Sequence, residues 1–155
     1  MPPFHARAMA VLATLLLATA CGSDDGSDPV DEVTVADLVG SWTASSLVYT
    51  NQADPSETFD LIANGGEVRV TVLTGGRART WVDFGSFSDE WDAQLTMNGS
   101  TLTSTPAEAS RPVQHFTFTL VGDVLTLTNQ DDAFDFTLTG ASPVAVTAVT
   151  VLERQ

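Results

Sequence analysis

The chain has 155 residues, enough for one domain, and carries a formal net charge of −14 at pH 7. Its six Arg residues, with no Lys, face 20 acidic residues, so it lacks the clustered cations that bind nucleic acid or dock on anionic lipid. This acidic excess indicates mainly colloidal solubility, with attraction of a cationic ligand or a divalent ion as the alternative. The single Cys excludes an intrachain disulfide.

Residues 1–20 have the three-part layout of an export signal. A start that holds His5 and Arg7 precedes an apolar run over 8–17, and small residues fill 18–20. The apolar run is too short to span a bilayer. We therefore expect residues 1–20 to be a removable signal peptide.

The Leu-Ala-Thr-Ala-Cys sequence that ends at Cys21 resembles the lipobox of bacterial lipoproteins. The resemblance implies that Cys21 becomes the lipidated N-terminus and anchors the chain in the lipid bilayer without spanning it. An ordinary signal peptide followed by a free thiol is the alternative. Residues 21–33 are rich in Gly, Ser and Asp, a composition that predicts a flexible acidic linker.

The residue after the lipobox bears on where the protein would be sorted. Gly22 stands there rather than Asp. By resemblance to the sorting rules of Gram-negative bacteria, this favours the outer membrane. The expected location is the bacterial cell envelope, with the periplasmic or the surface face left open.

The pattern of residues 34–155 predicts a domain built from short strands. Val68, Val70 and Val72 alternate with polar residues, as expected for a half-buried strand, and pairs such as Asn98-Gly99 predict hairpin turns. One helical turn is expected at 33–38, a turn at 129–132, and a bulge near Ala148 or burial on both faces of the last strand. Strands are expected at 40–50, 58–63, 67–74, 77–84, 91–97, 100–105, 113–121, 124–128, 133–139 and 144–152.

Short antiparallel strands without a long helix predict a barrel or a sandwich. Gly40-Ser41-Trp42 opens the first strand, G-x-x-L-T-x-T recurs at 99–105 and 122–128, and the last strand ends at Arg154. Together these features resemble the lipocalin-like domains of bacterial lipoproteins. The resemblance implies an all-β fold, a small antiparallel up-and-down barrel of about eight strands. It also implies that Gly40 and Trp42 close one barrel end, with Arg154 covering the Trp42 ring.

No catalytic constellation is present in the sequence. His115 is the only His after residue 20, it has no second His or Cys with which to bind zinc, and there is no G-x-S-x-G motif. Asp131, Asp132 and Asp135 are better explained by a turn than by a metal site. We expect no enzyme activity, no cofactor and no metal.

The aromatic residues suggest where a ligand would bind. Trp91 fits a core position, whereas Trp81, flanked by Arg79 and Asp83 on its face, is either exposed or lines a polar-rimmed interior. An eight-stranded barrel has room for side chains or for one small ligand. We expect a monomer that binds a small hydrophobic ligand, with a filled, non-enzymatic structural or interaction module of the envelope as the alternative. The possible lining residues are Trp81, Trp91, Phe116, Phe118, Phe134 and Phe136.

Overall fold

The computed structural model describes residues 32–140 and 142–155, which belong to one compact unit, Asp31–Gln155. The predicted signal peptide (1–20), Cys21 and the linker as far as residue 31 lie outside the described residues. Within the described part, no helix is long and apolar enough to cross a membrane.

One short helical turn precedes nine strands. In the turn, the Asp37 carboxylate accepts hydrogen bonds from the Thr34 backbone N–H and hydroxyl, both at 2.8 Å. The elements are η1 (Val35–Leu38), β1 (Gly40–Asn51), β2 (Thr58–Asp60), β3 (Glu67–Val72), β4 (Arg77–Phe84), β5 (Phe87–Asn98), β6 (Thr101–Pro106), β7 (Gln114–Val121), β8 (Val124–Phe134) and β9 (Val144–Arg154).

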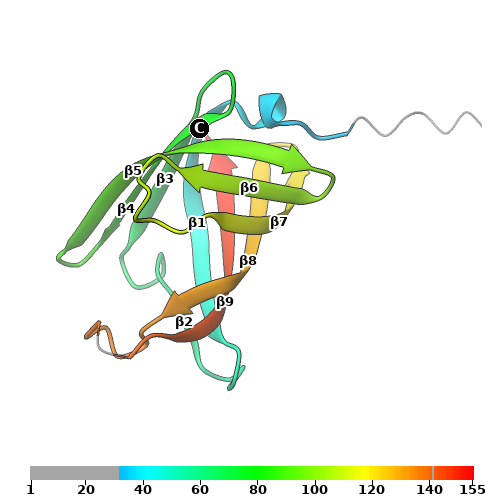
Figure 1. Cartoon of the computed structure of the whole chain (residues 1–155). Coiled ribbons are helices and arrows are strands. Elements are labelled where there is room, and N and C mark those ends of the chain that lie inside the picture. The colour runs from blue at the N-terminus through cyan, green and yellow to red at the C-terminus, as the bar shows by residue number, and fades with distance from the viewer. Residues whose placement is uncertain (1–31, 141) are drawn as a thin grey trace, which may run out of the picture. The chain divides into compact units, whose positions relative to one another are not determined.

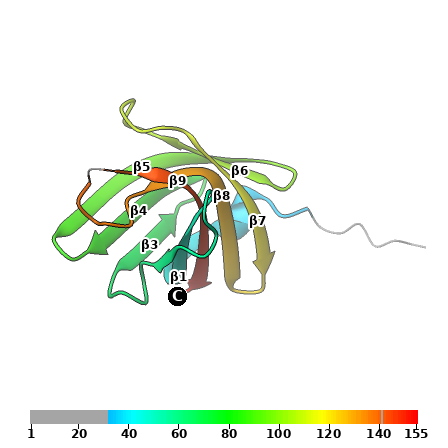
Figure 2. The ribbon, with the colours of Figure 1, turned by 90° about the horizontal axis from the view of Figure 1, so that it is seen from below.

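The strands form a closed antiparallel barrel. β1 and β3 to β9 pair in chain order, and β1 also pairs with β9 from Trp42↔Arg154 to Asn51↔Val146, so that eight strands make the ring (Figures 1 and 2). β2 is an extra strand, which pairs with Val48–Thr50 on the same edge of β1 that β3 uses at Gly40–Thr43. The all-β barrel predicted from the sequence is confirmed.

β9 alternates without interruption, so the bulge predicted near Ala148 is wrong. Val146, Ala148 and Leu152 are all buried, and these even-numbered positions face inward throughout. The irregularities lie instead in the two neighbours of β9. In β1, Ser45 is the extra residue between the pairs Ala44↔Leu152 and Ser46↔Val151.

The second bulge lies in β8, where a turn was predicted at 129–132. Asn129 pairs with Ala148 and Asp132 pairs with Val146, so β8 advances three residues while β9 advances two. The strand continues to Phe134. The separate strand predicted at 133–139 is therefore wrong beyond Phe134, and residues 135–140 form turns and bends.

Side-chain hydrogen bonds hold this second bulge. The Asn129 Oδ1 atom accepts from the Asp131 N–H at 2.9 Å, and the Gln52 Nε2 atom donates to the Gln130 carbonyl at 2.6 Å. These contacts satisfy backbone groups that the ladder cannot pair at an extra residue. Before the bulge the odd-numbered residues of β8 face inward, and after it the even-numbered residues do. Asp132 consequently faces the interior.

Candidate functional site

One end of the barrel is closed by Trp42. Its side chain is 1% exposed, and its indole Nε1–H donates to the Leu38 carbonyl at 2.8 Å. The Arg154 guanidinium lies 4.2 Å from the centroid of the Trp42 ring. The sequence-predicted pair is thus brought together in a cation–π contact on a buried ring.

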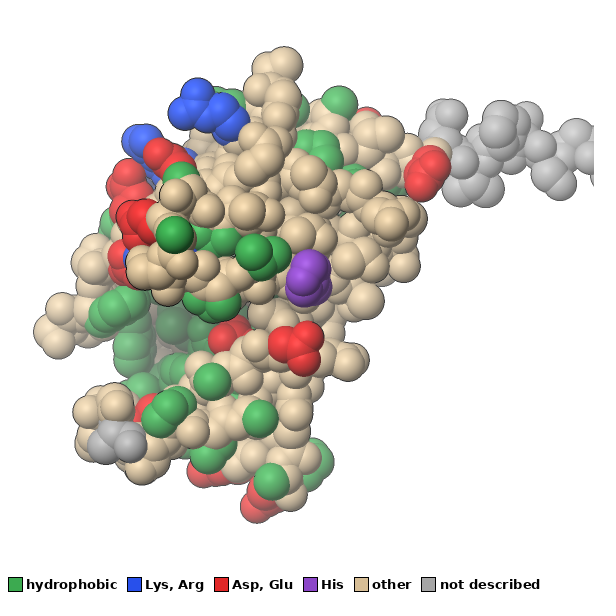
Figure 3. Space-filling model, viewed as in Figure 1, with side chains coloured by type: hydrophobic (Ala, Val, Ile, Leu, Met, Phe, Trp, Pro, Cys, Tyr) green, Lys and Arg blue, Asp and Glu red, His purple; other side chains and the backbone are tan. Residues whose placement is uncertain are grey.

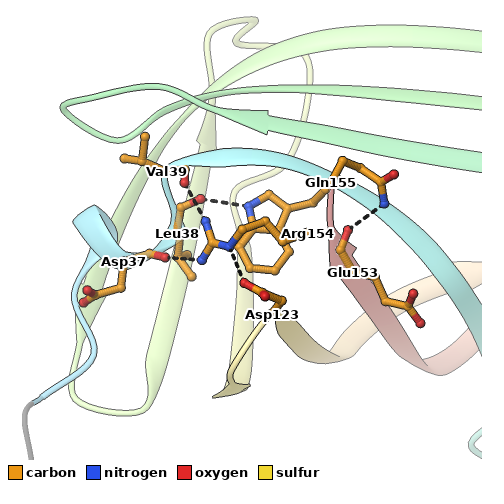
Figure 4. A network of polar contacts seen from close by, with 8 residues as sticks. Asp37, Leu38, Val39, Asp123, Glu153, Arg154 and Gln155 are labelled. Carbon is orange, nitrogen blue, oxygen red and sulfur yellow. Dashed lines mark hydrogen bonds and ion pairs between the residues drawn. The ribbon is translucent and has the colours of Figure 1, made fainter.

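The Arg154 guanidinium also ties three segments together (Figure 4). It donates to the Val39 carbonyl at 2.6 Å, to the Asp37 carbonyl at 2.8 Å and to the Asp123 carboxylate at 3.0 Å. Gly40 has φ of +141°, and a Cβ atom there would meet Arg154 Nη1 at 3.0 Å. Gly40 therefore allows both the backbone conformation and the close approach of the guanidinium.

Side chains do not fill the interior of the barrel between Trp42 and the open end. A mostly apolar hollow of about 160 Å³ is bounded by inward residues of the barrel strands, from Leu38 and Trp42 at the closed end to Tyr49 and Asp132. A second hollow, about 520 Å³ and open to solvent, continues towards Phe84 and Phe134. Tyr49 and Val82 line both hollows. The space-filling view shows a recess walled by hydrophobic side chains, with acidic side chains near its rim (Figure 3).

Aromatic rings surround the open end. Tyr49 and Phe134 stack with centroids 4.2 Å apart and planes 8° apart, and Phe59 lies 5.1 Å from Phe134. Phe84 meets Phe59 edge-on at 5.7 Å, and Phe136 meets Phe134 edge-on at 5.2 Å. These rings pack against one another, so the open end has apolar, aromatic walls.

Two polar groups lie among these apolar surroundings. Burial raises the pKa of Tyr49 to about 12, with a contribution from the Asp132 charge. Burial also raises the pKa of Asp132, and the hydrogen bond from the Ala133 N–H, at 2.8 Å, offsets only part of that effect. Among the described residues, Asp132 forms no ion pair and the Tyr49 hydroxyl has no hydrogen-bond partner.

Other charged side chains near the open end have ion-pair or hydrogen-bond partners. Arg111 lies 4.7 Å over the Trp91 ring, and both oxygens of Asp89 accept from its Nη2 group at 2.7 Å. The Asp135 carboxylate, which lines the outer hollow, accepts hydrogen bonds from the backbone and hydroxyl of Thr137. In the described part of the chain, neither hollow is lined by an Arg or a His.

The six predicted lining residues divide into two groups. Trp91 and Phe116 line the inner hollow, and Phe134 lines the outer one. The other three line neither. Trp81 lies on the outer face, where Arg69 is 4.7 Å from its ring, because its neighbours Thr80 and Val82 hold the inward positions. Phe118 packs on the core, and Phe136 contacts only the rim through Phe134.

Sequence reasoning did not place Tyr49 or Asp132 among the lining residues. Leu125 and Leu127 place odd positions of β8 inside, which would turn Asp132 outward. A signal was present in the sequence, since the inward-fitting aromatic Phe134 has even parity. That change of parity requires one extra residue in the strand.

Potential metal-ligating side chains are scattered over the described residues. Within them, no group of three His, Cys, Asp or Glu side chains lies close enough to hold a metal ion. His115 is exposed on β7 and meets the Thr103 hydroxyl at 3.1 Å through Nδ1.

Comparisons with known proteins give little further information. No family model matches the chain, and no curated protein matches it. Among solved structures, the chain is similar to a protein described as "REP1-NXSQ fatty acid transporter", at 10% identity, over 77% of this chain and 97% of that one, with a TM-score of 0.39. That TM-score is too low for the likeness to indicate a ligand.

Proposed function

We propose that this protein binds a small hydrophobic molecule in the open half of its barrel. The observation that carries the proposal is the unfilled interior, about 160 Å³ inside and about 520 Å³ at the mouth. An apolar cavity of about 150 Å³ is large enough to take benzene, and typical ligand pockets measure about 300–1,000 Å³. The unfilled space weighs against the alternative of a filled structural module.

The shape of the wall supports binding as well. Closure at Trp42 leaves an entrance at the opposite end of the barrel, where the stacked Tyr49 and Phe134 form part of the wall. An apolar ligand that enters this preformed space loses contact with water, at a gain of about 25 cal/mol for each Å² removed. Because the space is preformed, little of that gain is lost to reorganisation of the protein, and the main cost that remains is the ligand's lost translational and rotational freedom.

Displacement of a neutral lipophilic dye tests the proposal. The full chain is denatured, freed of lipid and refolded, and N-phenyl-1-naphthylamine is then displaced with octanol. Ala148→Leu fills part of the inner hollow, whereas Val149→Leu enlarges the neighbouring side chain on the outer face of β9. We expect Ala148→Leu to weaken binding about tenfold or more and Val149→Leu to leave it unchanged. Failure of the unmodified protein to bind either molecule, with its far-UV spectrum intact, would overturn the proposal.

Membrane anchoring is the second part of the proposed function. The apolar run over 8–17 and the small residues before Cys21 support export followed by acylation at Cys21. Acylation would attach the domain to the bacterial envelope through the linker of residues 21–33. In cells fed an alkyne-bearing fatty acid, we expect the chain to be labelled and recovered with membranes. Cys21→Ser should abolish both results; labelling that survives the substitution would contradict the assignment.

A further inference from the structure

We propose that the ligand carries a positively charged alkylammonium head, held at the mouth by Asp132 and the surrounding aromatic rings, with its apolar tail in the inner hollow. This inference rests on the proposed binding function and specifies the class of ligand. It rests on the side chains that line the hollows. These include Asp132 and several aromatic rings and, among the described residues, no cationic side chain.

The carboxylate is the first part of the argument. The bulge in β8 gives Asp132 an inward position, and Asp132 lines the inner hollow near its open end. Among the described residues, its one hydrogen bond comes from the neighbouring Ala133 N–H. The remaining acceptor capacity of the carboxylate is therefore available to a donor inside the hollow.

Keeping this carboxylate charged is costly without a partner. Burial raises the pKa of Asp132, so the local environment disfavours the ionised form. An Asn would fit the same space without a charge to desolvate. A carboxylate kept in such a position is typical of a binding or catalytic site, and a bound cation would supply the missing counter-charge.

The aromatic rings are the second part. Tyr49, Phe59 and Phe134 form a continuous stack at the mouth, with Phe84 against one side. Faces of aromatic rings attract cations, most strongly quaternary ammonium groups, when the site is desolvated. Of these rings, Tyr49, Phe84 and Phe134 line the hollows. An aromatic wall beside a carboxylate suits an ammonium head better than an uncharged one.

An anionic head would find no counter-charge. Neither hollow has a cationic residue in its described lining. Arg111, the cation near Trp91, is already paired with both Asp89 and Glu108. The chain as a whole carries a net charge of −14, which attracts cations and repels anions during encounter.

The size of the inner hollow limits the tail. About 160 Å³ accommodates roughly one benzene-sized group or a short alkyl chain. Asp132 lies at the open side of this space, so the head of a bound molecule would remain near the mouth. The expected ligand is therefore a small amphiphile whose charged group follows a short apolar tail.

Three octyl compounds with different heads test the inference. Octyltrimethylammonium, octanol and octanoate are each used to displace the neutral dye from the full chain, at pH 7.5 and 0.15 M salt to screen long-range charge. We expect octyltrimethylammonium to bind about tenfold more tightly than octanol, and octanoate to bind most weakly. Asp132→Asn should remove most of the preference for the cation while leaving octanol affinity the same or higher.

Asp131→Asn is the matched control, since Asp131 is the exposed neighbour in the same bulge and its loss changes the net charge equally. It should leave the preference intact. Equal loss in the two variants, or octanoate binding as tightly as octyltrimethylammonium, would overturn the inference while octanol binding upholds the proposed function. If octanol and the dye also fail to bind, the proposed function falls as well.

Discussion

The two ends of the barrel use polar groups in opposite ways. At the closed end, the Trp42 indole donates to Leu38, and Arg154 donates to two carbonyls and to a carboxylate. At the open end, Asp132 has no ion pair among the described residues and the Tyr49 hydroxyl has no partner there. The polar groups of the first end are satisfied within the protein, whereas those of the second keep unused hydrogen-bonding capacity among the described residues.

This difference predicts that substitutions at the two ends will have different effects. Satisfied buried polar groups rigidify a structure, whereas a buried charge without a counter-ion costs free energy. Confining the costly groups to the open end leaves the barrel closure undisturbed. Substitutions at the closed end should therefore destabilise, and those at the open end should change affinity more than folding.

Trp42→Ala should have the largest effect on stability. Removal of a fully buried indole leaves a cavity at the closed end and frees the Leu38 carbonyl, so we expect a loss of about 3–5 kcal/mol in the free energy of unfolding. Urea denaturation measures it. The control is Trp81→Ala on the outer face, which should cost far less. Similar losses for the two variants would contradict the assigned roles.

Arg154→Ala should come next, at about 2 kcal/mol, because the variant loses the contact with Trp42 and leaves the Val39 and Asp37 carbonyls without donors. Arg79→Ala is a suitable control, since the ion pairs of Arg79 with Asp92 and Glu90 are exposed. Thermal melting compares the two variants. An unchanged melting temperature for Arg154→Ala would contradict a stabilising role for the Arg154 contacts at the closed end.

Asp132→Asn should stabilise the ligand-free protein at neutral pH. The gain in the free energy of unfolding should be smaller than the losses expected for Trp42→Ala and Arg154→Ala. The folded pKa of Asp132 is raised, so the wild-type protein loses stability as pH rises from the unfolded pKa through the folded pKa. Below the unfolded value, about 3.9, the group is protonated in both states and the difference between the proteins should vanish. Melting at pH 7 and at pH 3 tests this. A variant less stable than the wild type at pH 7 would show that the carboxylate is satisfied.

Tyrosine ionisation offers the smallest but most local test. Tyr49 is the only Tyr in the chain, so tyrosinate absorbance reports on this one group. Its pKa is raised to about 12, by burial first and by the Asp132 charge second. At pH 10.5 the folded protein should show little tyrosinate, and Asp132→Asn should titrate at lower pH than the wild type. Ionisation near pH 10 in the folded state would mean that Tyr49 is not enclosed.

The sequence predicted the barrel because its strands alternate regularly and its turns contain Gly. It also predicted the approach of Arg154 to Trp42, through the resemblance carried by Gly40-Ser41-Trp42. The parity of Phe134 was the one local sign of the bulge in β8, and it was outweighed by the turn-like composition of residues 129–132. Part of what holds the bulge is distant in the sequence, since Gln52 donates to the carbonyl of Gln130. The inward position of Asp132 therefore depends partly on tertiary structure.

The most direct test of the central claim follows methyl groups by NMR while octanol is added to the refolded, lipid-free full chain. The claim predicts saturable shifts at inward methyl groups of the hollow, such as those of Val70, Leu127 and Thr150, with outward Val149 and Val151 unaffected. Shifts confined to outward methyl groups, or no saturable shift at all, would contradict binding in the open half of the barrel.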